Sequence, residues 1–205
     1  MRPPDTAIDS DAQDRDDMAA LCAGRDAALD SLMARHAGPL CGFLTRLLQD
    51  EEEAADLAQT AFVRVYQNRG RFNPAQKFST WLYAIAANLA RDRLRWLGRH
   101  PHVSINAPVA DDGSDATEVL PHESPGPAEV LDAAERATIV RAAVAALPED
   151  LREPLILAEY EGMSQADIGA VLDCSAKAVE MRIYRARQQM RQTLGSLLSD
   201  QRDNP

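Results

Sequence analysis

Residues 164–191 combine cationic and aromatic side chains at a spacing that suits contact with a nucleic acid. Ser164 followed by Asp167 predicts the start of a short helix, and Ser175 predicts the start of a second one. Along the second helix, apolar residues recur every three or four positions and should bury one face; they are Val179, Ile183, Ala186 and Met190. The opposite face carries Lys177, Glu180, Met181, Tyr184, Arg185 and Gln188, with Arg182 and Arg187 on its flanks. This arrangement predicts a helix-turn-helix whose cationic second helix enters a major groove, although a solvated helical hairpin would show the same short pattern.

The charge of the chain is unevenly distributed. The formal net charge is -10 and the isoelectric point about 4.8, so the surface as a whole should repel DNA. Residues 1–17 carry six Asp against two Arg, and residues 101–136 carry eight acidic side chains against one Arg. In contrast, residues 91–99 carry four Arg against one Asp, and residues 175–191 carry five basic side chains against Glu180. This separation favours a DNA-binding protein with low non-specific affinity.

The sequence contains no pattern that predicts catalysis. It shows no cluster of metal ligands, no glycine-rich phosphate loop and no nucleophile paired with a base, and its four histidines are scattered. Cys22, Cys41 and Cys174 are odd in number and lack CxxC spacing, which argues against a metal site or a disulfide framework. We therefore expect no enzymatic activity, no cofactor and no metal. Because no apolar run resembles a signal peptide or could span a bilayer, we expect a cytoplasmic protein.

Helical periodicity dominates the segments that would position these side chains. An amphipathic pattern runs from Leu29 to Leu48, with Gly38-Pro39 expected to kink it. Asp50 predicts the start of a second helix, and Ser79 the start of a third that places Trp81 and further apolar residues inward. Two more helices are expected around 130–146 and from Leu147-Pro148, ahead of the helix-turn-helix. No strand pattern is present, so the predicted fold class is all-α.

The helical segments fall into two small domains, 18–99 and 130–196. Residues 100–129 contain repeated Pro and Gly among scattered acidic residues, and we expect them to form a flexible acidic linker. Residues 1–17 are expected to be a disordered acidic tail for the same reason, and residues 197–205 a short C-terminal tail.

Three motifs in this order carry a resemblance to a known family. They are DEEEAADLAQTAFVRVYQNRGRF, KFSTWLYAIAANLARDRLR and ALPEDLREPLILAEYEGMSQADIGAVLDCSAKAVEMRIYRARQQMR. Together they resemble the sigma-70 family of bacterial transcription initiation factors, and most closely the extracytoplasmic-function (ECF) group, which keeps only region 2 and region 4. The resemblance covers residues 25–97 and 130–195. It implies a factor that binds core RNA polymerase, directs it to promoters with -10 and -35 elements and helps to open the DNA.

The resemblance assigns two roles to the first domain, sigma region 2. The helix after Asp50 docks on the clamp helices of the largest catalytic subunit, with Asp56, Gln59, Thr60 and Val63 off its apolar stripe. The following loop and third helix read the -10 element as a melted strand. The side chains expected to contact it are Phe72, Trp81, Tyr83, Asn88, Arg91, Arg93 and Arg95. Housekeeping members have a tryptophan pair where this chain has Ala84 and Ile85, which implies weaker melting and a stringent promoter.

The resemblance assigns reading of the -35 element to the second domain, sigma region 4. Base contacts fall on Glu180, Met181, Tyr184 and Arg185, while Lys177, Arg182 and Arg187 complete the DNA-binding set. Glu180 stands where a basic residue is common, and a carboxylate accepts a hydrogen bond from cytosine rather than donating one to guanine.

Further partners follow from the family. They are the flap of the second catalytic subunit and an anti-sigma factor, often membrane-anchored, that inserts between the domains. The alternative is a stand-alone helix-turn-helix regulator, which would explain 147–191 but leave the first domain without a role.

Overall fold

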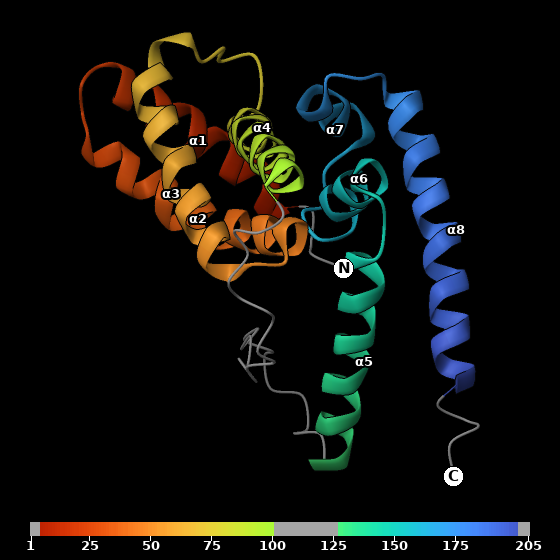
Figure 1. Ribbon diagram of the computed structural model, residues 1–205. Coiled ribbons are helices and arrows are strands. Elements are labelled where there is room, and N and C mark those ends of the chain that lie inside the picture. Colours follow the sequence, from red (N-terminus) through yellow and green to blue (C-terminus); the bar gives the residue numbers. More distant parts are fainter. Residues whose placement is uncertain (1–4, 101–126, 201–205) are drawn as a thin grey trace.

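The structure is a computed structural model that describes residues 5–100 and 127–200. Within these ranges the regular elements are all helical and no strand occurs, which agrees with the all-α prediction. In chain order the elements are α1 (Asp5–Cys22), α2 (Ala27–Leu48), α3 (Glu51–Asn68), the short 3₁₀ helix η1 (Arg69–Arg71), α4 (Phe78–Arg99), α5 (Pro127–Ala145), α6 (Glu149–Glu159), α7 (Gln165–Leu172) and α8 (Ala176–Asp200) (Figure 1).

Helices α2, α3 and α4 build the core of the first half. α2 buries large side chains along one face, and it continues through Pro39 as a single helix. α3 opposes it with a face of mostly small residues, which lets the two helix backbones approach closely. The carboxylate of Asp50 accepts a hydrogen bond from the Glu53 amide at 3.0 Å, so the predicted start of α3 is confirmed.

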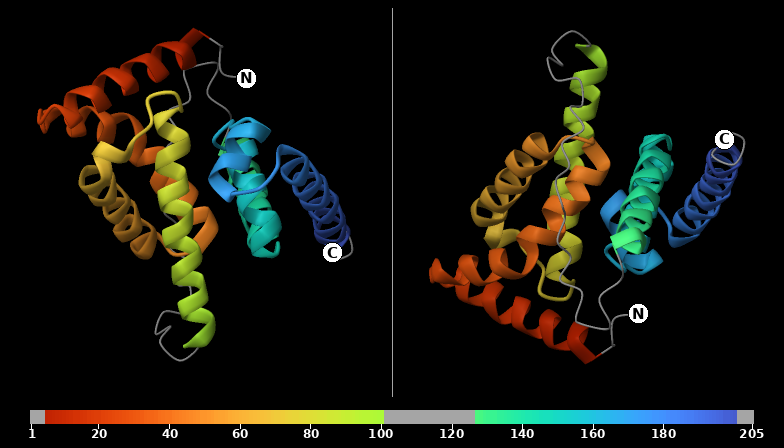
Figure 2. Two further views of the ribbon diagram at one scale, coloured as in Figure 1. Left: turned by 90° about the horizontal axis from the view of Figure 1, so that it is seen from above. Right: turned by 90° about the horizontal axis from the view of Figure 1, so that it is seen from below.

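The N-terminal segment differs from its expected disorder. Residues 5–22 form α1, which packs against α2 and α4 (Figure 2). The helix buries Met18 and Leu21, and it also buries the carboxylate of Asp14, which is bonded to Arg35 and His36 of α2. The expectation of a disordered tail over 1–17 was therefore wrong for residues 5–17. The acidic composition does not show that the segment has a short apolar face, or that the Asp14 carboxylate is paired when it is buried. Residues 1–4 lie outside the described ranges.

Helices α6, α7 and α8 build the second half, and α5 runs alongside α8 and also contacts α2 (Figure 1). The Ser164 hydroxyl accepts from the Asp167 amide at 3.1 Å, and the Ser175 hydroxyl from the Ala178 amide at 3.2 Å, so both predicted helix starts are confirmed. Ser79 does not begin α4, which starts at Phe78 with Lys77 at the preceding position. α6 begins at Glu149, one residue later than expected.

The two halves are in direct contact. α4 packs against α7, and α2 packs against α6 (Figure 2). The buried apolar residues of both halves join in one cluster. Of the expected linker 100–129, residues 101–126 lie outside the described ranges and 127–129 belong to α5. α8 extends to Asp200, so the expected tail 197–205 begins as helix and its last five residues are not described. None of the helices in the described ranges is long and apolar enough to cross a membrane.

Candidate nucleic-acid interface

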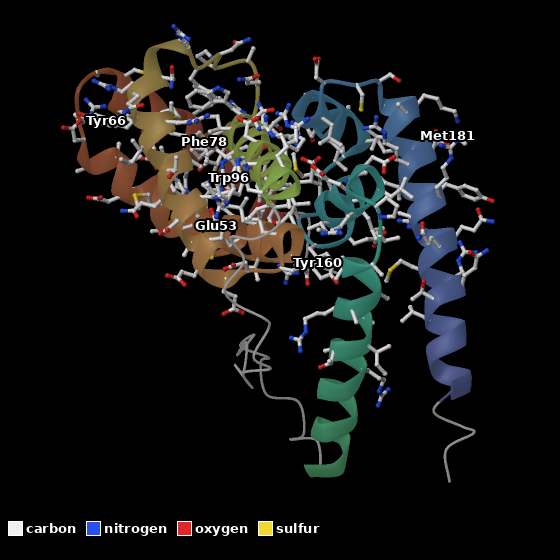
Figure 3. All side chains as sticks on the ribbon, in the orientation of Figure 1. Glu53, Tyr66, Phe78, Trp96, Tyr160 and Met181 are labelled. Atoms are coloured by element: carbon white, nitrogen blue, oxygen red, sulfur yellow. The ribbon has the colours of Figure 1, made fainter. Side chains whose placement is uncertain are left out.

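The outward face of α8 has the composition that helical periodicity predicted. Val179, Ile183 and Ala186 are buried, whereas Met181 is 41% and Tyr184 59% exposed. Figure 3 shows Met181 pointing away from the body of the molecule. Lys177, Glu180, Arg185 and Gln188 share this exposed face. An exposed aromatic and an exposed thioether beside cationic groups form a surface that can contact both base edges and phosphates.

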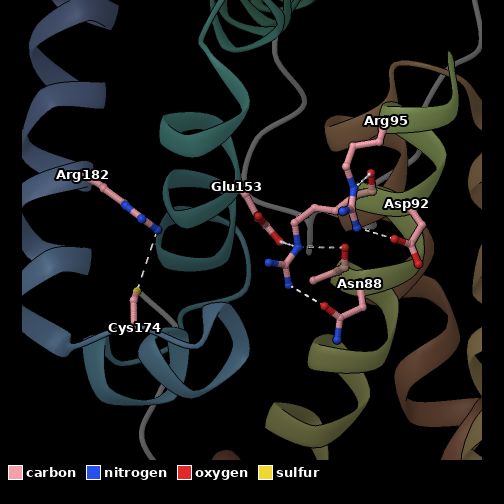
Figure 4. A network of polar contacts seen from close by, with 8 residues as sticks. Asn88, Asp92, Arg95, Glu153, Cys174 and Arg182 are labelled. Atoms are coloured by element: carbon pink, nitrogen blue, oxygen red, sulfur yellow. Dashed lines mark hydrogen bonds and ion pairs between the residues drawn. The ribbon is translucent and has the colours of Figure 1, made fainter. Parts of the chain in front are cut away.

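Ion pairs within the second half already hold several of these charges. Lys177 pairs with Glu180 at 2.9 Å, so the unusual acid at position 180 partly neutralises its neighbour. Arg187 donates from Nε to Glu159 of α6 at 2.9 Å. The Arg182 side chain turns back toward Cys174, 3.8 Å from its sulfur (Figure 4). Among the contacts of the described residues, Arg185 has no acidic partner, which leaves its guanidinium available to a base.

A tight turn fixes α8 relative to α7. Asp173 ends α7 in the left-handed conformation with φ 51°, and the Cys174 amide donates to the Gly169 carbonyl at 2.9 Å. A Cβ at Gly169 would lie 2.7 Å from the Cys174 carbonyl oxygen, closer than van der Waals contact permits. Glycine is therefore required at this position, because the turn brings the backbone against α7.

An aromatic cluster and an open cavity lie together at the start of α4. Phe72 lies 5.3 Å from Trp81 and 6.3 Å from Phe78, measured between ring centroids. Beside them is a cavity of about 260 Å³, which two helices and the intervening 3₁₀ turn line with Arg64, Asn68, Arg71, Trp81, Ile85 and Asn88. Cationic and amide side chains next to an aromatic cluster can hold an unstacked base. Sequence reasoning found Trp81 and Asn88 but missed Arg64, Asn68 and Arg71; the four-residue spacing of Arg64 and Asn68 was the available signal.

The three arginines expected to hold phosphates each have a protein partner. Arg91 donates from Nη2 to the Asn88 side chain at 2.8 Å, and its Nε lies 3.8 Å from the Glu153 carboxylate (Figure 4). Arg93 pairs with Glu53 of α3 at 2.6 Å and lies over the Trp96 ring, so it connects α3 and α4. Arg95 pairs with Asp92 one turn away while remaining exposed. Arg95 is thus the most available of the three for DNA, since its side chain is 70% exposed, against 29% for Arg91 and 31% for Arg93.

Tyr83 is not on the surface. Only 4% of it is exposed, its ring packs against Phe43 at 5.3 Å, and its hydroxyl donates to the Glu161 carboxylate. Burial, together with the Glu161 charge, raises the pKa of Tyr83, so the hydroxyl stays protonated. In this arrangement Tyr83 cannot contact a nucleotide, because its ring is buried against Phe43 and its hydroxyl is bonded to Glu161.

A separate surface lies on the outer face of α3. Asp56, Gln59 and Val63 are exposed there, Val63 to 48%, and Thr60 is half-buried beside them. This face of α3 is therefore open to solvent, with one apolar side chain between an acid and an amide. Within the described ranges no group of His, Cys, Asp and Glu could hold a metal ion.

Comparison with known proteins identifies both halves. Residues 32–100 match the family model Sigma-70 region 2, and residues 137–190 match Sigma-70, region 4. The chain is 37% identical over 180 residues to the RNA polymerase sigma-H factor of Pseudomonas aeruginosa, covering 86% of this chain and 91% of that protein. It is 33% identical over 172 residues to the ECF RNA polymerase sigma-E factor of Escherichia coli K12, covering 80% of this chain and 85% of that one.

Two solved structures share the fold. One is CnrH in complex with the cytosolic domain of CnrY, with a TM-score of 0.65, 28% identity, and coverage of 90% of this chain and 98% of that one. The other is the sigma factor RpoE of Bartonella quintana in complex with the anti-sigma factor NepR, with a TM-score of 0.62, 20% identity, and coverage of 81% and 96%. At that identity the second similarity concerns the fold alone.

Proposed function

The chain belongs to the sigma-70 family and, within it, to the ECF group of RNA polymerase sigma factors, which direct promoter-specific transcription initiation. From this premise we propose which surface of the chain binds each partner. Region 2 reads the -10 element, region 4 reads the -35 element, and α3 holds core polymerase. The protein is not an enzyme, because a sigma factor supplies recognition while the polymerase supplies the chemistry. A stand-alone helix-turn-helix regulator is set aside, since residues 32–100 of the first half match region 2.

The cavity beside Trp81 is the proposed site for an unstacked base of the -10 element. Its volume of about 260 Å³ and its lining of arginine, asparagine and tryptophan suit a base held by stacking and edge hydrogen bonds. Asn88 offers an amide to the base edge, while Arg64 and Arg71 are placed to hold phosphates. Ala84 and Ile85 supply no aromatic ring that could insert between base pairs and help to melt the DNA. This fits a factor that depends on a promoter of stringent sequence.

The observation that carries the -35 assignment is the exposed face of α8. Tyr184 and Arg185 are free to approach a groove, and the neighbouring Lys177–Glu180 pair presents a carboxylate that can accept from cytosine. Arg182 and Arg187 lie at the edges of this face, where phosphates pass.

The exposed face of α3 is the proposed docking surface for the clamp helices of the largest polymerase subunit, and the flap of the second subunit is the proposed partner of region 4. Because CnrH was solved with the cytosolic domain of CnrY and the Bartonella factor with the anti-sigma factor NepR, we also propose that an anti-sigma factor, which could be membrane-anchored, binds this chain in the cytoplasm.

The test of the proposed function is holoenzyme assembly followed by run-off transcription on genomic fragments. Asp56→Ala/Gln59→Ala should weaken binding to core polymerase by about tenfold or more while leaving the melting temperature unchanged, because both side chains are exposed. Gln67→Ala, an exposed position at the other end of α3, is the matched control. Undiminished assembly by the double variant would contradict the docking assignment.

A further inference from the structure

A neighbouring side chain fixes the orientation of the Asn88 amide. Nη2 of Arg91 lies 2.8 Å from Oδ1 of Asn88, three residues back along α4. A guanidinium carries N–H donors and no acceptor, so the amide atom that faces it must be the oxygen. Figure 4 shows the contact to the Asn88 oxygen, with the amide nitrogen on the other side. The NH2 group is therefore the part of the amide that is left for a ligand.

Arg91 is held in place for this contact by its own helix. Its Nε donates to the Ala87 carbonyl, four residues back, at 3.3 Å. Both hydrogen bonds therefore lie within about one turn of α4 and need no other element. Asn88 lines the cavity at the start of α4, whereas Arg91 does not. Arg91 thus acts on the edge of a ligand in this cavity through Asn88.

The amide that α3 contributes to the cavity has the reverse orientation. Nδ2 of Asn68 donates to the Arg64 carbonyl at 2.9 Å. A carbonyl oxygen only accepts, so Asn68 keeps its own oxygen for a ligand. The guanidinium groups of Arg64 and Arg71, which also line the cavity, add donors and no acceptor. Donors are therefore in excess in the cavity, and Asn68 supplies its amide acceptor.

This set of groups distinguishes between the DNA bases. An asparagine reads adenine by a bidentate contact that uses its amide oxygen and nitrogen together. The oxygen of Asn88 already accepts from Arg91, which keeps it from pairing in this way. Thymine, guanine and cytosine each carry an exocyclic carbonyl oxygen that can accept from the NH2 group. The exocyclic group of adenine is an amino group, which adds a further donor to a site where donors are already in excess.

We propose that Arg91 is a positioning residue that sets the base preference of the cavity. By holding the Asn88 oxygen, it makes Asn88 a hydrogen-bond donor toward the base, and the cavity consequently prefers a base with a carbonyl oxygen over adenine. This inference rests on the proposed function, since it takes the cavity to be the site of an unstacked base of the -10 element. The orientation of the amide is a property of the free chain and does not depend on that role.

The orientation is tested by nuclear magnetic resonance on the full-length free protein with isotope-labelled asparagine. The Asn88 NH2 protons should show nuclear Overhauser contacts with the Trp81 and Ile85 side chains, which line the same cavity. Arg91→Lys keeps a side chain that only donates and should retain these contacts. Arg91→Glu supplies an acceptor that draws the NH2 group toward position 91, and should remove them. Unchanged contacts in Arg91→Glu would overturn the positioning role.

The base preference is tested by transcription with reconstituted holoenzyme on a template library randomised at the -10 element. Asn88→Ala identifies the position that the cavity reads. At that position the unmodified factor should use adenine about fivefold less than the other bases, and Arg91→Lys should keep this difference. In Arg91→Glu adenine should rise to at least parity, because the amide oxygen then faces the base. Arg91→Gln places no new charge beside Glu153 and has a side chain that both donates and accepts, so it should reduce the difference.

Arg99→Glu is the matched control for Arg91→Glu. It makes the same charge reversal at an exposed position further along α4 and outside the cavity. The added acid should weaken promoter binding in general but leave the order of bases unchanged, because phosphate repulsion does not depend on sequence. Preferences are compared within each variant, so a general loss of affinity cancels.

Failure of the inference and failure of the proposed function are distinguishable. If Asn88→Ala changes no preference within the -10 element, the cavity is not the base site. The proposed role of the cavity and its base preference then both fall, while the amide orientation stands on the resonance data. If Asn88→Ala changes a position at which the unmodified factor uses adenine as readily as the other bases, the inference alone is overturned. The same holds if Arg91→Glu raises the use of adenine no more than Arg99→Glu does.

Discussion

The Glu153 carboxylate lies 3.8 Å from Nε of Arg91, close enough to feel its charge but too far to accept a hydrogen bond from it. The oxygen that faces Arg91 has no hydrogen-bond partner, and only 4% of the residue is exposed. Burial consequently outweighs the attraction of Arg91 and raises the pKa of Glu153 to about 7. Arg182 of α8 also favours the ionised form, while Glu149 of α6 opposes it.

Stability should therefore depend on pH through Glu153. Because the pKa of Glu153 is raised in the folded protein, its contribution to the free energy of unfolding is fully present below about pH 4.5, where the side chain is protonated. This contribution is lost as the pH rises through about 7. Glu153→Gln removes this dependence and should be more stable than the unmodified protein by roughly 1–3 kcal/mol at pH 8, with the gap closing toward pH 5. Denaturant unfolding of both proteins, followed by circular dichroism between pH 5 and pH 8, measures this difference in stability. A gap that stays constant across this range would contradict the assignment.

The docking of α1 should depend on Asp14. Its side chain is 1% exposed, and it accepts from Nε of Arg35 at 3.0 Å and contacts Nε2 of His36 at 2.8 Å. Asp14→Ala removes the buried acceptor that Arg35 and His36 share, although Arg35 keeps its ion pair with Asp17 at 2.5 Å, and should lower the free energy of unfolding by roughly 2–4 kcal/mol. Asp16→Ala, on the exposed face of the same helix, should change it by less than about 0.5 kcal/mol. Chemical denaturation of both variants makes the comparison, and equal losses would show that the buried pair contributes nothing specific.

The helix-turn-helix should not tolerate a side chain at Gly169. A Cβ there meets the Cys174 backbone oxygen at 2.7 Å, so Gly169→Ala should destabilise region 4 by about 1–3 kcal/mol and weaken -35 recognition by displacing α8. Gly195→Ala, within α8 where a Cβ meets nothing within 4 Å, should instead be neutral or stabilising. Thermal unfolding of the two variants distinguishes a steric requirement from a general effect of removing glycine.

The two readers should be separable by mutation. Arg185→Ala should cost about 1–3 kcal/mol of discrimination at the -35 element and leave -10 preference intact, because it removes an exposed guanidinium from α8 alone. Asn88→Ala should do the reverse, since Asn88 lines the cavity of region 2. The measurement is transcription by variant holoenzymes on a promoter library randomised at both elements. A change of -10 preference in Arg185→Ala would show that the readers are not divided between the regions.

What the sequence determined by itself is the local structure and the outward faces. Interactions within a few residues along one helix determine the apolar periods of α3 and α8 and the caps at Asp50, Ser164 and Ser175. They also determine the exposure of Met181 and Tyr184. The motif order likewise led to regions 2 and 4, which the family matches confirm.

Only the tertiary structure decided which polar side chains are already paired. Asp14 binds a helix 21 residues further along the chain, Arg93 pairs with Glu53 across 40 residues, and Tyr83 reaches Glu161 across 78. Such partners leave no periodic trace, because the pattern of one helix shows only which face is apolar and not which helix covers it. For this reason the acidic N-terminal segment was predicted to be disordered, Tyr83 was assigned to DNA, and the contact between the two regions was not foreseen. These features depend on how folding brings distant segments together.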